Sequence, residues 1–332
     1  MMLLNDIITA KHWSDVMRST EILQSRTGNE NIFSRFQNAI KKNWELYLMF
    51  LPVAVFYIMF CYRPMYGIIM AFQDYVPRLG LSGSSWTGFL QFERFFSNHY
   101  FWRLLKNTFT ISGLSILVGF PAPIIFALLL NEIKNSKYKR TVQTITYLPH
   151  FISIVVICSM IRTFTADNGV LTNLAVMLGG SRKSMLNDAN LFVPIYVLSD
   201  IWQNMGWSSI IYIAALSGIN TELYEAAQID GANRWKQVLH VTLPGIMPTI
   251  TIMLILRLGG ILSVGYEKII LLYNPVTYKT ADVISTYVYR QGLLEYNWSY
   301  SAAVGLFNSV VNFLFLITSN RVSKKLGETS LW

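Results

Sequence analysis

The sequence predicts an all-α membrane protein with six transmembrane helices, an N-terminal interfacial helix and a cytoplasmic loop that contains two short helices. Hydrophobic residues make up 53% of the 332 residues and charged residues only 14%, whereas soluble domains contain about 25% charged residues. Apolar runs of about 20 residues, which suffice to cross about 30 Å of hydrocarbon, recur along the chain. The excess of apolar surface therefore favours lipid as the solvent of this protein.

Six apolar runs have the length of a spanning helix. Several contain Pro or Gly, which a membrane bundle tolerates because neighbouring groups satisfy the freed backbone. Arg63-Pro64 is expected to break the first run near its end. We predict the spans at about 46–71, 107–130, 142–164, 191–217, 246–265 and 301–320.

Basic residues indicate the orientation of the spans. With six spans, Lys41 and Lys42, the basic loop 131–140 and the tail after Asn320 all lie on one side, which the positive-inside rule makes cytoplasmic. The net charge of +9 is spread over such loops, so membrane topology explains it better than nucleic-acid binding does. We therefore expect a cytoplasmic N-terminal extension (1–45), a transmembrane domain (46–320) and a cytoplasmic tail (321–332).

Two flanking segments have patterns of their own. Ile32, Phe33, Phe36 and Ile40 recur at helical spacing among basic residues, which is typical of a helix lying in the membrane interface. The predicted outer loop after the first span is rich in aromatic residues, and an interfacial belt is favoured over a surface for docking a partner protein. These aromatic residues are Trp86, Phe92, Phe95, Phe96, Tyr100, Phe101 and Trp102.

The inside loop 221–244 is predicted to contain two short helices. Good helix formers occupy the first, at 221–229. Gly231 permits a sharp turn, and Asp230 or Asn233 can cap the second helix, which we expect to run to about Val241. Pro244 is expected to stop this helix before the next span begins.

The same loop has the properties of a docking element. Ala226 and Ala227 are small and permit close approach of another chain. Trp235, Val238 and Leu239 form an apolar stripe with Ala232 at helical steps, which suits a groove on a partner. The residues alone leave open the alternative that the loop packs against its own bundle.

The loop resembles the EAA coupling loop of ABC importer permeases of the binding-protein-dependent transport family. That family has Ile where this chain has Val241, which is a mild exchange. The resemblance implies that the loop inserts into a cleft of a cytoplasmic ATPase subunit and transmits its motion. The residues that match the family pattern are Glu225, Ala226, Ala227, Asp230, Gly231, Ala232, Leu243 and Pro244.

Three further segments, 147–153, 265–275 and 282–290, are similar to the subgroup that imports polysaccharide fragments. The resemblance implies a second homologous permease, two cytoplasmic ATPase subunits that hold ATP and Mg, an extracytoplasmic solute-binding protein and a bacterial inner membrane. The cargo would be an oligosaccharide, with acidic fragments such as those of alginate as one option. It also implies that the outer loop contacts the binding protein, through Asn274, Tyr278, Tyr287 and Arg290.

The sequence contains no motif for catalysis. A Walker-type Gly-x-x-x-x-Gly-Lys-Ser/Thr stretch and a zinc-protease motif are both absent from the chain. Its four His (His12, His99, His150 and His240) are scattered, and Cys61 and Cys158 lie in apolar runs, as buried hydrophobic residues do. We expect no catalytic residue, cofactor or metal in this chain, so ATP hydrolysis must occur in another one.

Polar residues inside the spans indicate a substrate pathway, because such residues usually face a cavity or one another. Trp202 and Asn204 fit the stacking and hydrogen bonding by which sugars are held. Arg257 suits an acidic sugar, although Asp200 or a backbone carbonyl is the favoured partner. Asn308 and Asn312 suit helix–helix hydrogen bonding equally well. The candidate pathway residues are Trp202, Gln203, Asn204, Arg257, Asn308 and Asn312.

Two rival functions are weighed against the importer. An ion-coupled secondary carrier usually has inverted repeats and intramembrane acids, but no clear repeat is visible, and Asp200 is the only good intramembrane acid. A membrane sensor or scaffold would conduct no substrate and would need no ATPase at the loop 221–244. Both rivals are disfavoured.

Overall fold

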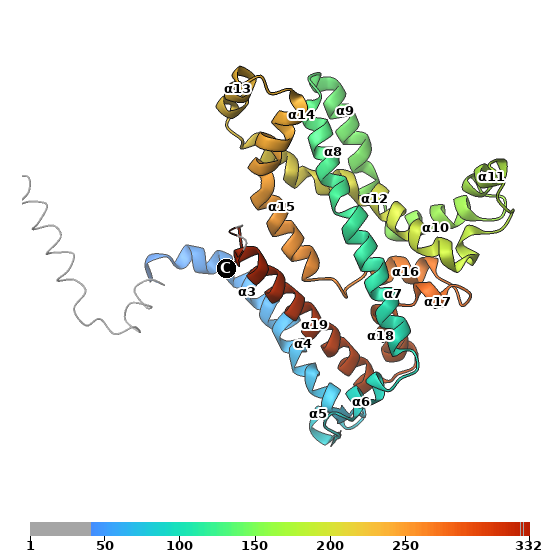
Figure 1. Ribbon diagram of the computed structural model, residues 1–332. Coiled ribbons are helices and arrows are strands. Elements are labelled where there is room, and N and C mark those ends of the chain that lie inside the picture. The colour runs from blue at the N-terminus through green and yellow to red at the C-terminus, as the bar shows by residue number, and fades with distance from the viewer. Residues whose placement is uncertain (1–40, 326, 328) are drawn as a thin grey trace, which may run out of the picture. The chain divides into compact units, whose positions relative to one another are not determined.

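The computed structural model describes residues 41–325, 327 and 329–332. The predicted interfacial helix, at 32–40, lies outside them. Helices dominate the described chain (Figure 1), as expected for an all-α membrane protein. The chain divides into two compact units, Met1–Tyr66 and Gly67–Trp332, which we describe separately.

The first unit contains an apolar helix that begins at Trp44. It continues without interruption through Pro64 into the second unit, so the helical stretch spans Trp44–Phe72. The predicted break at Arg63-Pro64 is therefore wrong. The elements are α3 (Trp44–Phe56), the π-helical turn η1 (Tyr57–Tyr62), α4 (Arg63–Met65) and the 3-10 segment η2 (Tyr66–Phe72).

The second unit contains a small element of two strands and two short helices near its start. Two short strands pair antiparallel, with Gln73 opposite Trp86 and Asp74 opposite Ser85. The pairing closes the loop between the first two long helical segments. Its elements are β1 (Gln73–Asp74), α5 (Gly80–Gly83), β2 (Ser85–Trp86) and α6 (Leu90–Phe96).

The middle of the second unit corrects the predicted third span. Instead of one helix over 142–164, the chain breaks at Ile152 and Ser153, which are extended. Pro149 lies in the 3-10 turn before this break and has no N–H to continue an α-helix. The elements are α7 (Phe101–Leu114), η3 (Ser115–Gly119), α8 (Pro121–Glu132), α9 (Ser136–Tyr147), η4 (Leu148–Phe151), α10 (Ile154–Thr165), α11 (Val170–Met177), η5 (Met185–Asn187) and α12 (Ala189–Ser217).

The last part of the second unit corrects the predicted fifth span, which ends at Leu258 rather than at Gly265. Gly259 and Gly260 follow in a turn. The elements are α13 (Thr221–Ile229), α14 (Arg234–Gln237), η6 (Val238–Thr242), α15 (Leu243–Leu258), α16 (Tyr266–Leu272), α17 (Tyr278–Ala281), α18 (Ile284–Tyr289), η7 (Arg290–Leu294) and α19 (Trp298–Lys325).

Three π-helical turns explain why proline does not end these helices. The turns η1, η3 and η6 each end two residues before a proline: Pro64, Pro121 and Pro244. At η6 the N–H of Leu243 donates to the carbonyl of Val238, five residues back. This register shift re-pairs the backbone where proline supplies no donor. Our prediction that Pro244 stops the coupling-loop helix is therefore wrong.

Five helical stretches in the described part of the chain are long and apolar enough to cross a membrane. The predicted count of six is thus not confirmed. The helix α12 has 29 residues but is not among the five, since Asp200, Gln203 and Asn204 lie at its centre. The five are Trp44–Phe72, Phe101–Glu132, Ile154–Met177, Arg234–Leu258 and Trp298–Lys325.

The helix α12 is the centre of the second unit. It packs against α8 along much of its length and also contacts α9, α15 and α17; Figure 1 shows it crossing behind α8. Phe192 and Val197 of α12 join Ile157 and Ile269 in one buried cluster, and Tyr212 joins a second. A third cluster, which includes Phe95, Leu104, Leu262, Ile284 and Val304, connects α6, α7, α18 and α19.

Close packing of α12 on α9 depends on Gly206. A Cβ at this position would collide with the carbonyl oxygen of Thr146. We expect Gly206→Ala to lower the free energy of unfolding by about 1–3 kcal/mol, the usual cost of overpacking. Thermal unfolding of the purified protein in detergent measures this change.

Gly113→Ala is the matched control, because Gly113 is also helical and a Cβ there meets no atom within 4 Å. Alanine exceeds glycine in helix propensity by about 1 kcal/mol, so this variant should be as stable as the wild type or more stable. Equal stability of the two variants would contradict the proposed packing role of Gly206.

Candidate functional site

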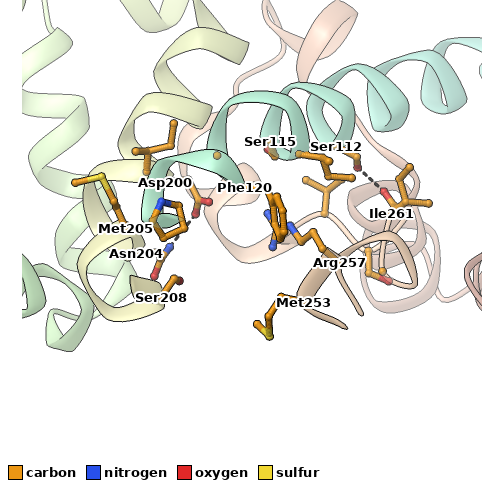
Figure 2. Close-up of a pocket in the computed structure, with 18 of the residues that line it drawn as sticks. Ser112, Ser115, Phe120, Asp200, Asn204, Met205, Ser208, Met253, Arg257 and Ile261 are labelled. Atoms are coloured by element: carbon orange, nitrogen blue, oxygen red, sulfur yellow. Dashed lines mark hydrogen bonds between the residues drawn. The ribbon is translucent and has the colours of Figure 1, made fainter. Parts of the chain in front are cut away.

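A cavity of about 450 Å³ lies inside the second unit (Figure 2). Its walls come from α7 and η3, the first turn of α8, the middle of α12, the end of α15 and the segment 260–265. Ser112 of α7 donates a hydrogen bond to the carbonyl of Ile261, which fixes this segment beside the cavity. The cavity is therefore built by elements far apart in the sequence.

Two charged residues line the cavity, Asp200 from α12 and Arg257 from the last turn of α15. Figure 2 shows the Arg257 side chain among the residues that line the cavity. Within the described residues, no carboxylate lies within 4.0 Å of its guanidinium. The predicted pairing of Arg257 with Asp200 is therefore not found.

Asp200 instead pairs with Lys268 of α16, whose Nζ lies 3.7 Å from Asp200 Oδ1. Lys268 is only 4% exposed, which is unusual for lysine. This residue was not predicted from the sequence, because it lies after the end of the predicted fifth span. The one sequence feature that could have drawn attention to Lys268 is the segment 265–275, which is similar to the subgroup that imports polysaccharide fragments.

Hydrogen bonds continue from Asp200 along one face of α12. Asn204 Nδ2 donates to Asp200 Oδ1 at 3.0 Å, and Asn204 Oδ1 lies 3.1 Å from His150 Nδ1. The His150 ring stacks on Trp207, with the ring centroids 4.7 Å apart. Asn204 is thus held at both ends, and it fixes the position of the Asp200 carboxylate in the cavity wall.

The structure brings only two of the six predicted pathway residues to the cavity, Asn204 and Arg257. Trp202 is about half exposed and lies outside the lining, and Gln203 is buried. Asn308 Oδ1 is buried without a hydrogen-bond partner among the described residues. Asn312 accepts from the N–H of Leu262 and donates to Ser263 Oγ, so it holds the segment that follows α15.

The segment 221–244 has the predicted local structure in its first half. The helix α13 spans Thr221–Ile229, and Gly231 has φ of +73°. The N–H of Ala232 donates to the carbonyl of Ala227, which is the long bond of a glycine-terminated helix end. Asn233 then caps the second helix by accepting from the N–H of Lys236.

The surface of this loop is strongly exposed. Glu225, Ala226, Asp230 and Gly231 are exposed, while Ala227 and Ala232 are half-buried. Large apolar side chains are exposed beside them, with Ile229 at 87% and Trp235 at 75%. Leu243 and Pro244 instead lie within the continuous helix Arg234–Leu258. Arg234 forms an ion pair with Glu132 at 3.2 Å, which ties the loop to the end of α8.

The segment 274–290, which was predicted to lie on the outer side, is held together by Asp282, which is fully buried. Arg290 donates two hydrogen bonds to its carboxylate, at 2.7 and 3.2 Å, and Arg103 of α7 lies 3.6 Å from it. Tyr287 is buried, and Arg290 lies over the rings of Tyr278 and Tyr287. Two of the four predicted binding-protein contacts, Tyr287 and Arg290, thus take part in the interior of this segment.

The other two predicted contacts lie nearer the surface. Asn274 and Tyr278 are both half-buried. Asn274 Nδ2 donates to the carbonyl of Leu186 and to Asn187 Oδ1, which joins the segment to η5. The aromatic residues of the predicted outer loop are divided in the same way, since Phe95 and Phe101 enter the core whereas Trp86 and Trp102 are exposed.

Comparisons with known proteins assign the class. Residues 119–327 match the family described as "Binding-protein-dependent transport system inner membrane component". The chain belongs to this family. It is therefore an inner-membrane transport component rather than a catalytic subunit, as the resemblance implied.

Individual relatives make the assignment finer. The chain is 43% identical to Protein LplB of Bacillus subtilis (strain 168), over 89% of this chain and 93% of that protein. It is also 43% identical to the polygalacturonan/rhamnogalacturonan transport system permease protein YteP of the same organism, over 86% of this chain and 90% of that protein. The second of these relatives is named as the permease of a transport system.

A solved structure supports the same grouping. The match is a chain of a bacterial alginate ABC transporter in complex with an alginate pentasaccharide-bound periplasmic protein, with a TM-score of 0.82 and 45% identity. It covers 90% of this chain and all of the other. The predicted membrane permease fold is therefore confirmed, and the ion-coupled carrier is not favoured.

Proposed function

We propose that this chain forms part of the membrane pathway of an ATP-driven importer for acidic oligosaccharides. The observation that carries the proposal is Arg257, a cation in the cavity with no carboxylate partner in the described structure. An arginine binds a carboxylate through two parallel hydrogen bonds, and it does so most strongly where water is scarce. A uronate group of the cargo would supply that partner.

The substrates of similar proteins support an acidic cargo. YteP is named for the transport of polygalacturonan and rhamnogalacturonan, and a similar solved transporter is involved in the import of the acidic polysaccharide alginate. In the proposed pathway, Arg257 binds the carboxylate and Asn204 orients the sugar by hydrogen bonding. Trp202, Gln203, Asn308 and Asn312 contribute to the wider path.

The energy for transport comes, in this proposal, from two cytoplasmic ATPase subunits that hold ATP and Mg. The segment 221–244 docks into one of them, and its exposed Ile229 and Trp235 supply the apolar contact area. Glu225 to Ala232 form the turn that fits the cleft. Both termini then lie in the cytoplasm, and a second homologous permease docks the other ATPase.

A solute-binding protein delivers the cargo at the outer face. The similar alginate transporter was solved in complex with such a periplasmic protein. We propose that the segment 274–290 contacts the binding protein of this importer through Asn274 and Tyr278. Tyr287 and Arg290 support this surface from inside, through the Asp282 carboxylate.

Arg257→Gln tests the proposed substrate class. In a reconstituted assembly, we expect alginate oligosaccharides and oligogalacturonides to bind directly and to stimulate ATP hydrolysis in the wild type. The variant should need at least about tenfold more of either oligosaccharide for half-maximal stimulation, since it loses a charged, bidentate contact. Ser208→Ala, at an uncharged position of the same wall, is the matched control and should change little.

Three outcomes would contradict the proposal. Equal responses of the Arg257→Gln variant and the wild type would remove Arg257 from the pathway. A wild type that prefers carboxyl-reduced oligosaccharides would exclude the acidic cargo. Uptake that proceeds without ATP would favour a secondary carrier.

A further inference from the structure

The ion pair beside the cavity joins one half-buried and one buried partner. Lys268 has a side chain 5% exposed, whereas that of Asp200 is 31% exposed and faces the cavity. Within the described chain no hydrogen-bond acceptor lies at Lys268 Nζ, and the only carboxylate near it is that of Asp200 at 3.7 Å. A buried ammonium is costly without a counter-charge, so Asp200 and Lys268 form a neutral unit.

The position of Asp200 makes its charge important to any anion in the cavity. Its carboxylate is held by Asn204, which His150 holds in turn, so it cannot easily rotate out of the wall. Without Lys268, Asp200 would repel an entering carboxylate and would cancel the charge of Arg257. With Lys268 in place, the charged residues of this wall have a net single positive charge.

We propose that Lys268 sets the preference of the cavity for anions, by neutralising Asp200 so that the charge of Arg257 remains available to a carboxylate of the cargo. This inference rests on the proposed function, and it names a residue that determines specificity within it. Lys268 does not line the cavity. It acts through Asp200 and is therefore a positioning residue.

The test compares three forms of the reconstituted assembly: wild type, Lys268→Gln and the double variant Asp200→Asn with Lys268→Gln. The probes are an alginate oligosaccharide and the same oligosaccharide with its carboxyl groups reduced to alcohols. The readouts are direct binding of each labelled probe without binding protein, and the half-maximal concentration for ATPase stimulation with it. The ratio of the values measured for the two probes reports the preference for charge. A general loss of activity affects both values and leaves this ratio unchanged.

We expect Lys268→Gln to lower the preference for the acidic probe by about tenfold or more, the order of magnitude for an uncompensated charge a few ångströms away in a protein environment. The double variant should restore the preference to within about threefold of the wild type, because both charges of the pair are removed together. Co-purification of all subunits establishes that each variant assembles. A structural role for Lys268 would change both probes equally.

Two results would overturn the inference. The first is an assembled Lys268→Gln variant that prefers the acidic probe as strongly as the wild type does. The second is a double variant that loses as much of this preference as Lys268→Gln alone. Failure of the proposed function is distinguishable, because it shows in the wild type as no preference for the acidic probe. If Lys268→Gln fails to assemble, the double variant and Asp200→Asn decide: both must retain preference for the acidic probe, since each leaves Arg257 unopposed.

Discussion

Gly231→Val is expected to lower ATP-driven uptake by at least about tenfold. Gly231 has φ of +73°, a conformation that costs an L-residue about 1–2 kcal/mol and a β-branched residue more. A Cβ here meets no atom of the chain within 4 Å, so the cost is conformational and not steric. The turn between α13 and α14 must open to avoid it, and the proposed docking surface is then lost.

Gly231→Asn is the matched variant, because asparagine tolerates the left-handed conformation better than other residues with a Cβ. We expect it to retain much of the uptake. Co-purification with the ATPase measures docking directly. Folding is measured separately, by the thermal unfolding of each variant. Undiminished uptake and assembly in Gly231→Val would contradict the assignment of this segment to ATPase coupling.

Asp282→Ala is expected to have the largest effect on stability, a loss on the order of 3 kcal/mol, because it leaves Arg290 and Arg103 without their shared buried counter-charge. It also removes the acceptor for Thr286 Oγ1, which lies 2.8 Å away. The segment 274–290 should be held less firmly on α7, where the hydrogen bonds of Asn107 and Thr108 remain. A lower midpoint of thermal unfolding and faster proteolysis of the outer loop would report this.

Glu267→Gln provides the control for charge. Glu267 is an exposed acid on α16, so its loss should shift the unfolding midpoint little, as is usual for surface substitutions. Equal effects of the two variants would show that Asp282 does not hold the segment together. Asp282→Asn should lie between them, because it keeps the shape and loses the charge.

Local sequence signals predicted the turn at Gly231 well. Only glycine adopts its positive φ without cost, and the side chain of Asn233 satisfies one free N–H group, that of Lys236, in the helix that follows. These signals act over a few residues and need no tertiary context. The helix 221–229 agrees with α13 for the same reason.

The signals that failed depend on context beyond the local sequence. Pro244 by itself predicts a helix end, because it has no N–H to donate. The π turn before it shifts the backbone pairing by one residue, and the helix continues through the proline. Lys268 looks like a surface residue until α16 and α12 pack together and bring Asp200 to it. Asn312 was expected to contact a neighbouring helix or the substrate, and it instead holds the backbone of Leu262. Three-dimensional neighbours decide the cases of Lys268 and Asn312, and the pairing of the helix backbone decides that of Pro244.

The continuous helix Arg234–Leu258 has a mechanical consequence. It carries Trp235 of the exposed loop at one end and Arg257 of the cavity at the other, and at about 1.5 Å per residue these are about 33 Å apart. A tilt of about 5° imposed at the loop would displace the Arg257 end by about 3 Å if the helix moved as a rigid rod. That displacement is about the length of one hydrogen bond. In the proposed importer, such a movement at the loop would therefore be enough to release an anion from this guanidinium.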